Sequence, residues 1–247
     1  MSPLLANVAL AALDDHFRAR WAAMGTQSQR WRAVQRGAAT YRLIRYADDF
    51  VVMVSGQRRH AEALREEVAG VLAPIGLRLS PEKTRVVHID QGFDFLGFHI
   101  RRRRKRGTQK QCVYTTPSKK AVQAAKDKVR YKTRRSTLHM SLAGLITSLN
   151  QTLRGWANYF RHGVSARAFH DLDTHAWWRI VGWIRAKYHG KSRLSRKELR
   201  RRFCDQGWRL AHDGVVFTGA SSVAVTRYRY RGSRIATPWA PTPAALT

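Results

Sequence analysis

The sequence feature that most constrains the fold is the stretch YRLIRYADDFVVMV at residues 41–54. Aromatic and β-branched residues, which favour strands, occupy both of its ends. The polar pair Asp48 and Asp49 separates the two apolar runs. This pattern predicts a β-hairpin whose tip lifts two adjacent carboxylates out of a buried sheet.

Adjacent carboxylates repel each other, and removing them from water makes it harder to keep both charged. A divalent cation bound between them relieves the repulsion. Mg²⁺ suits such a pair because it prefers oxygen ligands, retains several waters and accepts substrate phosphates. An isolated Asp-Asp pair is more often a solvated turn, so the interpretation of Asp48 and Asp49 depends on the rest of the sequence.

Four other short motifs accompany the YADD box at residues 46–49. They are SPLLAN at 2–7, GLRLSPEKT at 76–84, FDFLGF at 93–98 and GWANYF at 155–160. Together the five motifs resemble, in content and order, those of the group II intron-encoded reverse transcriptases, with GWANYF in the maturase region (domain X). Five motifs spread over residues 2–160 are far more specific than any one of them.

The resemblance implies an α+β fold. We expect a partial reverse-transcriptase palm with an antiparallel sheet at residues 1–116. A helical thumb and maturase domain should follow at residues 117–205, and short strands with a disordered tail at 206–247. The implied function is RNA-directed DNA synthesis together with assistance to intron splicing. The alternative is a non-catalytic maturase that binds and stabilises folded intron RNA.

The resemblance also implies roles for individual residues. Asp48 and Asp49 would hold Mg²⁺ for nucleotidyl transfer. Lys83 would stabilise or protonate the leaving pyrophosphate, the alternative being a surface lysine in a turn. The residues expected near the primer end and the nucleotide are Tyr46, Ala47, Phe95, Leu96 and Gly97. For the aromatic members of this set the alternative is core packing.

The third metal-binding carboxylate of the resembled family lies on a strand that precedes the SPLLAN stretch, whereas this sequence starts at Met1. We therefore expect a truncated frame or one half of a split enzyme that does not polymerise alone. Asp14 and Asp15 are the nearest acids, but the pattern places them on a helix, so neither is assigned to the metal site. The expected partners are intron RNA, a DNA primer or target, and a separately encoded N-terminal half.

Charge is distributed very unevenly along the chain. Residues 1–100 have 13 basic and 10 acidic residues, whereas residues 101–247 have 33 basic and 6 acidic. A net charge of +27 in one part of a chain indicates a polyanionic partner. The residues that we expect to bind RNA phosphates are Lys119, Lys120, Arg154, Arg161 and Arg167.

Hydrophobic periodicity predicts the remaining elements. We expect helices at residues 3–17, 58–72, 119–135, 141–162 and 166–188. Strand–turn–strand is expected at 77–89 and a strand pair or a single strand at 93–101. Residues 18–40 should form a surface connection or a helix tail, and residues 101–110 a solvated basic loop. The two cysteines give no zinc pattern, and no apolar run is long enough to span a membrane, so we expect a soluble cytoplasmic protein.

Overall fold

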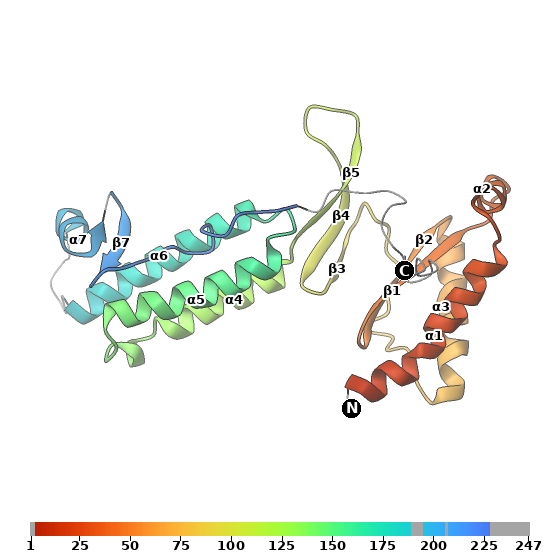
Figure 1. The fold of residues 1–247 in the computed structure, drawn as a ribbon, viewed down its shortest axis with the longest axis horizontal. Coiled ribbons are helices and arrows are strands. Elements are labelled where there is room, and N and C mark those ends of the chain that lie inside the picture. Colours follow the sequence, from red (N-terminus) through yellow and green to blue (C-terminus); the bar gives the residue numbers. More distant parts are fainter. Residues whose placement is uncertain (1–2, 189–194, 206, 228–247) are drawn as a thin grey trace, which may run out of the picture. The chain divides into compact units, whose positions relative to one another are not determined.

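The computed structural model describes residues 3–188, 195–205 and 207–227 (Figure 1). These residues form two compact units, residues 3–88 and residues 89–227, each with its own hydrophobic core. Both units combine helices with antiparallel strands, which confirms the expected α+β class. The expected three-part division of the chain stays a prediction.

The first unit packs a β-hairpin against two helices. Its elements are α1 (Pro3–Ala23), α2 (Gln27–Gln35), β1 (Thr40–Tyr46), β2 (Asp49–Ser55), α3 (Arg58–Leu72) and the short 3₁₀ helix η1 (Ala73–Ile75). Leu13 of α1, Leu43 of β1 and Leu64 of α3 are buried in one core. α1, α3 and the hairpin occur where the pattern predicts them, because their apolar residues supply this core.

An ion-pair cluster joins α1 to α3. The carboxylate of Glu67 accepts a bond from Arg20, and its Oε1 lies 2.6 Å from His16 Nε2. Burial raises the pKa of Glu67, but the bonds from His16 and Arg20 outweigh it and hold the pKa below its usual value. Glu67 is therefore a structural carboxylate that fastens the two helices together.

Residues 18–40 are more helical than expected. α1 continues to Ala23, and α2 follows after a short turn. Thr26 starts α2 with a capping box, in which its hydroxyl accepts the Gln29 N–H at 3.3 Å and the Gln29 side chain accepts the Thr26 N–H at 2.6 Å. The continuation of α1 agrees with the expected helix tail, whereas α2 was not predicted, because it buries no residue and depends on its cap rather than an apolar stripe.

The segment 77–89 does not form the expected strand–turn–strand. It contains a turn at residues 81–83 and forms no strand. Leu77 and Leu79 pack against the core of the first unit, which accounts for the alternating hydropathy. Alternation alone makes no strand, because a strand also needs a neighbour to satisfy its backbone groups, and Pro81 has no N–H to offer.

The second unit begins with a sheet of order β3–β4–β5 and continues with helices. Its elements are β3 (Phe93–Phe95), β4 (Phe98–Arg104), β5 (Gln111–Pro117), α4 (Lys119–Lys132), the 3₁₀ helix η2 (Arg135–Thr137), α5 (Leu142–Phe160), α6 (Ala166–Tyr188), α7 (Arg196–Phe203), β6 (Cys204–Asp205), β7 (Arg209–His212) and β8 (Val215–Val216). The helices α4, α5 and α6 confirm the three helices that the hydrophobic periodicity predicts in this part of the chain. Ser118, Ser141 and Ser195 cap α4, α5 and α7.

The first four residues of the expected basic loop form a strand. β4 continues through Arg104, which pairs with Gln111 of β5, so β4 and β5 form a ribbon. The carboxylate of Asp90 accepts two bonds from Arg102, at 2.6 and 2.9 Å, and the Asp90 carbonyl accepts one from Arg101 at 2.7 Å. Successive strand residues point to opposite faces, and Asp90 neutralises part of the charge, so a run of arginines is compatible with a strand here.

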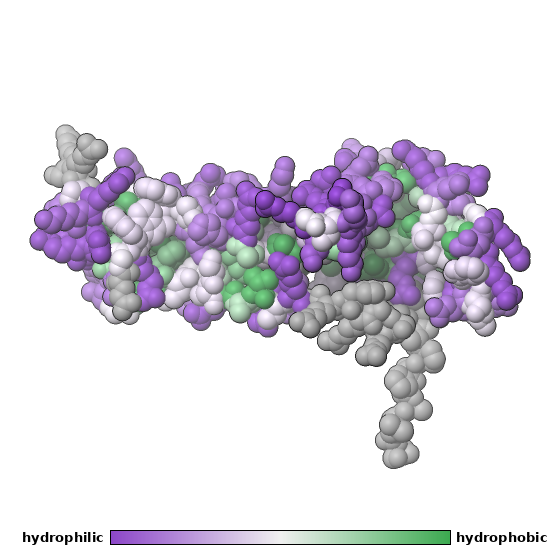
Figure 2. Space-filling model, turned by 90° about the horizontal axis from the view of Figure 1, so that it is seen from above, coloured by the Kyte–Doolittle hydropathy of each residue, from purple (hydrophilic) through white to green (hydrophobic). Residues whose placement is uncertain are grey.

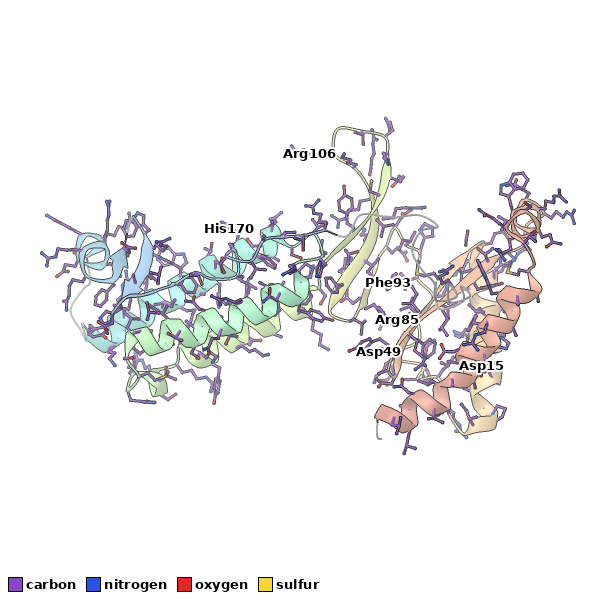
Figure 3. The ribbon with its side chains drawn as sticks, viewed as in Figure 1. Asp15, Asp49, Arg85, Phe93, Arg106 and His170 are labelled. Carbon is purple, nitrogen blue, oxygen red and sulfur yellow. The ribbon has the colours of Figure 1, made fainter. Side chains whose placement is uncertain are left out.

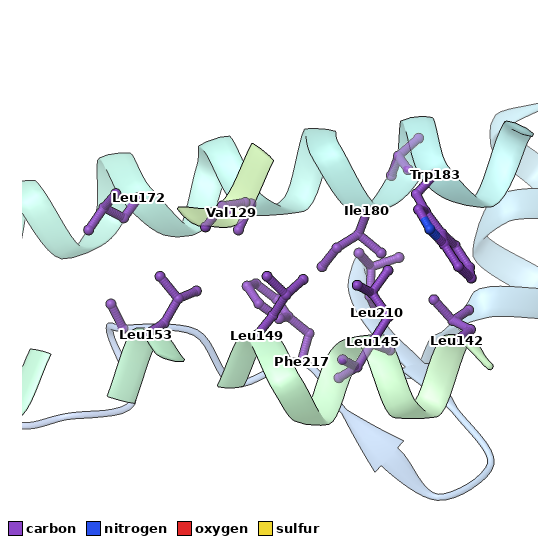
Figure 4. Close-up of a cluster of buried hydrophobic side chains, with 14 of the residues drawn as sticks. Val129, Leu142, Leu145, Leu149, Leu153, Leu172, Ile180, Trp183, Leu210 and Phe217 are labelled. Carbon is purple, nitrogen blue, oxygen red and sulfur yellow. The ribbon is translucent and has the colours of Figure 1, made fainter. Parts of the chain in front are cut away.

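The core of the second unit lies between α5, α6 and the segment that follows α7 (Figure 4). Leu149 and Ile180 are fully buried, and Leu210 and Phe217 of the following segment pack with them. The polar contacts of that segment are also specific, as Asn150 of α5 binds Val216, Thr218 and Gly219, and Asp173 of α6 accepts the N–H groups of Ala220 and Ser221. The segment 207–227 is thus packed on the helices and contributes buried residues to their core, while the expected disorder of the terminus lies outside the described residues.

Candidate metal site and nucleic-acid interface

The β1–β2 hairpin presents the two carboxylates as the sequence predicts. Tyr46 pairs with Asp49, so the connection consists of Ala47 and Asp48 alone. Asp48 and Asp49 are both exposed, and Asp49 lies at the hairpin tip (Figure 3). Ala47 has a left-handed φ of +52°, which non-glycine residues adopt only when their surroundings hold them there.

Arg45 supplies that support. Its Nη1 donates to the carbonyl of Ala47 at 3.0 Å and to Oδ1 of Asn7 at 2.8 Å. Its Nε donates to Oδ2 of Asp14 at 3.0 Å, and both members of this ion pair are largely shielded from solvent. The guanidinium of Arg45 therefore fixes the turn to α1. The turn is thus ordered before any ligand binds to it.

Sequence reasoning missed this role of Asp14. The sequence did not assign Asp14 to the metal site, and in the structure its carboxylate is bound to Arg45. A signal was present: Asn7 and Asp14 are seven residues apart, so they lie on one face of a helix, and an arginine directly precedes the YADD box. Arg45 connects the SPLLAN and YADD motifs, because it donates hydrogen bonds to Asn7 and to Ala47.

The carboxylate pair is open to a cation. Among the described residues, no hydrogen bond or ion pair involves the side-chain carboxylate of Asp48 or Asp49. Two exposed carboxylates fit Mg²⁺, which tolerates few protein ligands and fills its octahedron with water. Within the described ranges, no three His, Cys, Asp or Glu side chains gather closely enough to hold a metal ion. The pair therefore offers part of a metal site.

Lys83 lies in an exposed turn of the first unit. The backbone N–H groups of Lys83 and Thr84 donate to the carbonyl of Ser80 at 3.1 and 2.9 Å. In the described part of the chain, no hydrogen bond or ion pair joins Lys83 to the Asp48–Asp49 turn, so its catalytic role stays a prediction. Tyr46 is 67% exposed, so core packing in this unit does not account for it.

The FDFLGF motif forms a second tight hairpin, in the second unit. Phe95 pairs with Phe98, and Leu96 and Gly97 at the tip have φ values of +48° and +76°. Two left-handed residues in a two-residue connection are what the favoured hairpin turns require. The Gly97 carbonyl accepts the N–H of Ser118 at 2.8 Å, which ties the turn to the start of α4.

The GWANYF motif contacts the same turn. The Tyr159 hydroxyl donates to the carbonyl of Leu96 at 2.9 Å, and the Phe98 ring lies 5.7 Å from that of Tyr159 and 4.8 Å from that of Phe160, measured between centroids. A Cβ at Gly97 would approach Phe160 to 3.3 Å. The Leu96–Gly97 turn is therefore rigidly attached to α5.

Four of the five expected RNA-binding residues have exposed side chains. They are Lys119 and Lys120 in the first turn of α4, Arg154 on α5 and Arg167 on α6. Arg161, at the end of α5, is only half-exposed, and its Nε is buried without a hydrogen-bond partner. On the face shown in Figure 2, most of the visible described surface is hydrophilic.

Lys119 and Lys120 interact unfavourably with the dipole of their own helix, α4. The first turn of α4 contains no acidic residue, and the N-terminus of a helix carries a partial positive charge. Lys119 and Lys120 therefore reduce the stability of α4, and the same lysines with the exposed N–H groups of the helix attract anions. Their placement favours a role in binding over a role in folding.

A hollow between α4 and α5 adds basic residues that sequence reasoning did not select. It has a volume of about 520 Å³ and is lined by Lys128, Lys132, Gly155 and Trp156, among others. Lys132 donates to Ser148 Oγ at 2.6 Å, which holds its ammonium group in place. A half-buried tryptophan beside two lysines suits a nucleic acid, which offers both bases and phosphates.

Burial and nearby positive charge both lower the pKa of a histidine on α6. Burial lowers the pKa of His175, and the charges of Arg130, Lys126 and Arg179 lower it further. His175 is therefore neutral at physiological pH. Its Nε2 is buried and has no hydrogen-bond partner, so His175 adds no charge to the interface.

Two protein families match successive parts of this chain. Residues 1–100 match the family described as reverse transcriptase (RNA-dependent DNA polymerase), and residues 122–203 match the group II intron, maturase-specific domain. The first match contains the carboxylate hairpin, and the second contains α5, α6 and most of α4.

Two curated proteins resemble the chain over shorter stretches. Protein YkfC of Escherichia coli (strain K12) is 37% identical over 136 residues, which cover 49% of this chain and 36% of that protein. Group II intron-encoded protein LtrA of Lactococcus lactis subsp. cremoris is 38% identical over 69 residues, covering 28% of this chain and 11% of LtrA. The matched part is thus about a third of the length of YkfC and about a tenth of LtrA. No helix in the described ranges is long and apolar enough to cross a membrane.

Proposed function

Because this chain belongs to the group II intron-encoded reverse transcriptases and maturases, we propose that its second unit binds intron RNA and that its first unit presents two carboxylates of a polymerase site. The observation that carries the proposal is the braced hairpin tip with Asp48 and Asp49. It occurs in the same chain as a maturase-specific domain within a region of net charge +27.

The RNA-binding part rests on charge and shape. Lys119, Lys120, Arg154 and Arg167 are exposed cations, and each contact with a phosphate releases counterions. Folded RNA adds unpaired bases and a defined shape to this electrostatic term. The substrate that fits is therefore a structured intron RNA rather than any polyanion.

Competition at physiological salt tests this proposal, because salt dependence alone does not distinguish specific binding from general attraction. A structured group II intron RNA should displace labelled intron RNA from the chain more effectively than an equal mass of transfer RNA. Arg154→Ala should reduce the difference between intron RNA and transfer RNA as competitors. Arg161→Ala should reduce this difference too if the Arg161 guanidinium contacts the RNA. Equal competition by the two RNAs at every salt concentration would refute intron recognition.

For the polymerase part, the family uses Mg²⁺, and Asp48 and Asp49 would hold it here. Bound Mg²⁺ would stabilise the charge that develops during nucleotidyl transfer onto a DNA primer. The residues of this chain would contribute position: Arg45 holds the turn, and Lys83 would place a positive charge by the leaving group. The described residues provide two carboxylates, so a third would come from another polypeptide segment, such as a separately encoded N-terminal half.

Primer extension tests the polymerase part. The chain by itself should not extend a DNA primer on an RNA template, whereas adding a fingers-and-palm polypeptide from a relative should restore extension. Asp48→Asn should abolish the restored activity. Extension by the chain alone that Asp48→Asn abolishes would show that this chain contains a complete site.

A non-catalytic maturase is the second candidate function. The observation that favours this function is that, among the described residues, no third metal ligand lies close to the two carboxylates. A splicing assay separates the two candidates. If the Asp48→Asn/Asp49→Asn double variant assists splicing like the wild type and no complementing polypeptide gives extension, the maturase function stands alone.

A further inference from the structure

A second hollow lies between α6 and the segment that follows α4. Its volume is about 250 Å³, below the roughly 300–1,000 Å³ of drug-sized ligand sites. Trp178, Gly182 and Ala186 line it from α6. They are spaced four residues apart, so they form one row along the helix. None of the nine lining residues in the described part of the chain is acidic.

One wall of this hollow is an exposed aromatic ring. Trp178 is 59% exposed, which is unusual for so large an apolar side chain. Its ring is held by Trp177, whose ring meets it edge-on with centroids 4.8 Å apart, and Trp177 in turn donates to the carbonyl of Trp208 at 3.0 Å. At Gly182 there is open space where a Cβ would stand, so a flat group can lie beside the Trp178 ring.

The rim of the hollow is positively charged. Arg134 and Arg135 are both exposed and lie on the segment that faces α6. The Arg134 guanidinium lies 4.5 Å from the centroid of the Tyr131 ring, a cation–π arrangement that restrains it. The third arginine, Arg179, has another role, because it donates to the hydroxyl and the carbonyl of Thr133 at the end of α4.

The facing segment is fastened to α6 at further points. Trp183 Nε1 donates to the Thr137 hydroxyl at 3.1 Å, and Lys187 Nζ donates to the carbonyl of Leu138 at 2.8 Å. Together with Arg179, these donors hold residues 133–140 against the helix. The hollow is therefore a preformed feature, and a ligand would lose little of its binding free energy to ordering the protein.

We propose that this hollow is a binding site for an unpaired nucleobase of RNA, with the base stacked on Trp178 and the neighbouring phosphates on Arg134 and Arg135. The site is called the Trp178 pocket below. Aromatic rings bind unpaired bases by stacking, and arginines bind the flanking phosphates. The absence of acidic lining residues favours this ligand over a basic peptide. The inference deepens the proposed RNA-binding function and rests on it.

The test uses the full chain and two labelled RNA probes. One is a hairpin with an unpaired loop, and the other is a blunt duplex with the same number of phosphates. Trp178→Ala should weaken binding of the looped hairpin by about five-fold to a hundred-fold, the range for losing one stacked base, and leave the duplex nearly unchanged. Arg134→Ala should weaken both probes and lower the salt slope by about one unit.

A second variant fills the pocket without removing a ring. Gly182→Leu places a side chain in open space on a helix, where leucine is a better helix former than glycine. It should weaken hairpin binding as Trp178→Ala does. Gly70→Leu on α3 is the matched control, because Gly70 is also helical with open space at its Cβ, and it should leave hairpin binding unchanged.

Hairpin binding that both Trp178→Ala and Gly182→Leu leave unchanged would overturn the proposal and point to a protein partner for Trp178. Equal losses for hairpin and duplex would also overturn it, because stacking requires an unpaired base. The proposed intron specificity is tested separately by competition with transfer RNA. If transfer RNA competes equally while the pocket variants still lose hairpin binding selectively, the pocket stands and intron recognition fails.

Discussion

Replacing Lys119 or Lys120 by glutamate should stabilise the second unit and weaken its binding to RNA. Both lysines stand in the first turn of α4, directly after the cap Ser118. A charge near a helix terminus contributes about 0.3–1 kcal/mol. Reversing the sign removes an unfavourable term and adds a favourable one, so each variant should gain roughly 0.6–2 kcal/mol in free energy of unfolding at low ionic strength.

Thermal unfolding followed by circular dichroism measures the first half of this prediction. For a unit of this size, 1 kcal/mol corresponds to about 2–4 °C in melting temperature, so each variant should melt roughly 1–8 °C higher than the wild type. The gain should shrink at high salt, which screens the interaction with the dipole. Lys128→Glu is the matched control, because it changes the net charge equally but lies far from the first turn.

RNA binding measures the second half. Each lost phosphate contact should reduce the slope of log affinity against log salt by about 0.7–0.9. A lower melting temperature for both glutamate variants at low salt would refute the dipole argument and show that the lysines support the fold. A higher melting temperature with unchanged RNA affinity would refute their place in the RNA interface.

Three further predictions concern single side chains. Asp173→Ala should lower the free energy of unfolding by roughly 1–3 kcal/mol in urea titrations, because the N–H groups of Ala220 and Ser221 lose their acceptor; an unchanged midpoint would contradict this. Because burial lowers the pKa of folded His175 below its unfolded value near 6.5, the melting temperature should hold above that pH and fall as the pH drops below it. His175→Gln should flatten this dependence, and equal slopes for both proteins would exclude His175 as its source. Asp48→Asn and Asp49→Asn should each leave the melting temperature unchanged or raise it, since neutralising one carboxylate relieves repulsion; a large loss for both would make the pair structural.

The carboxylate hairpin and the long helices were predictable because local patterns determine them. The strands of the hairpin are rich in β-branched and aromatic residues, and α5 repeats its apolar residues at helical spacing with a serine cap before it. The order of elements in residues 40–72 and 119–188 follows from such patterns alone. The same holds for the exposure of Asp48 and Asp49, which follows from their place between two apolar runs.

Features that depend on distant contacts were not predictable. The burial of Leu210 and Phe217 depends on Asn150 and Asp173, which hold their segment on α5 and α6. The strand character of residues 101–104 depends on pairing with β5 and on Asp90. Conversely, residues 77–89 alternate like a strand but form no strand, and the carbonyl of Ile89 at their end accepts the N–H of Arg102 of β4. In each case the deciding partner lies far away in the sequence.

The contact between the FDFLGF and GWANYF motifs explains why two stretches about sixty residues apart belong to one pattern. The turn at Leu96 and Gly97 needs a left-handed backbone, and its two carbonyls need donors. The Tyr159 hydroxyl supplies one donor and the N–H of Ser118 the other, while Phe160 packs where a side chain at residue 97 would stand. Changing either motif would leave the other without its partner. The turn that the family resemblance assigns to the primer is therefore held by direct contacts to the start of α4 and to α5, helices that lie mostly within the matched maturase-specific domain.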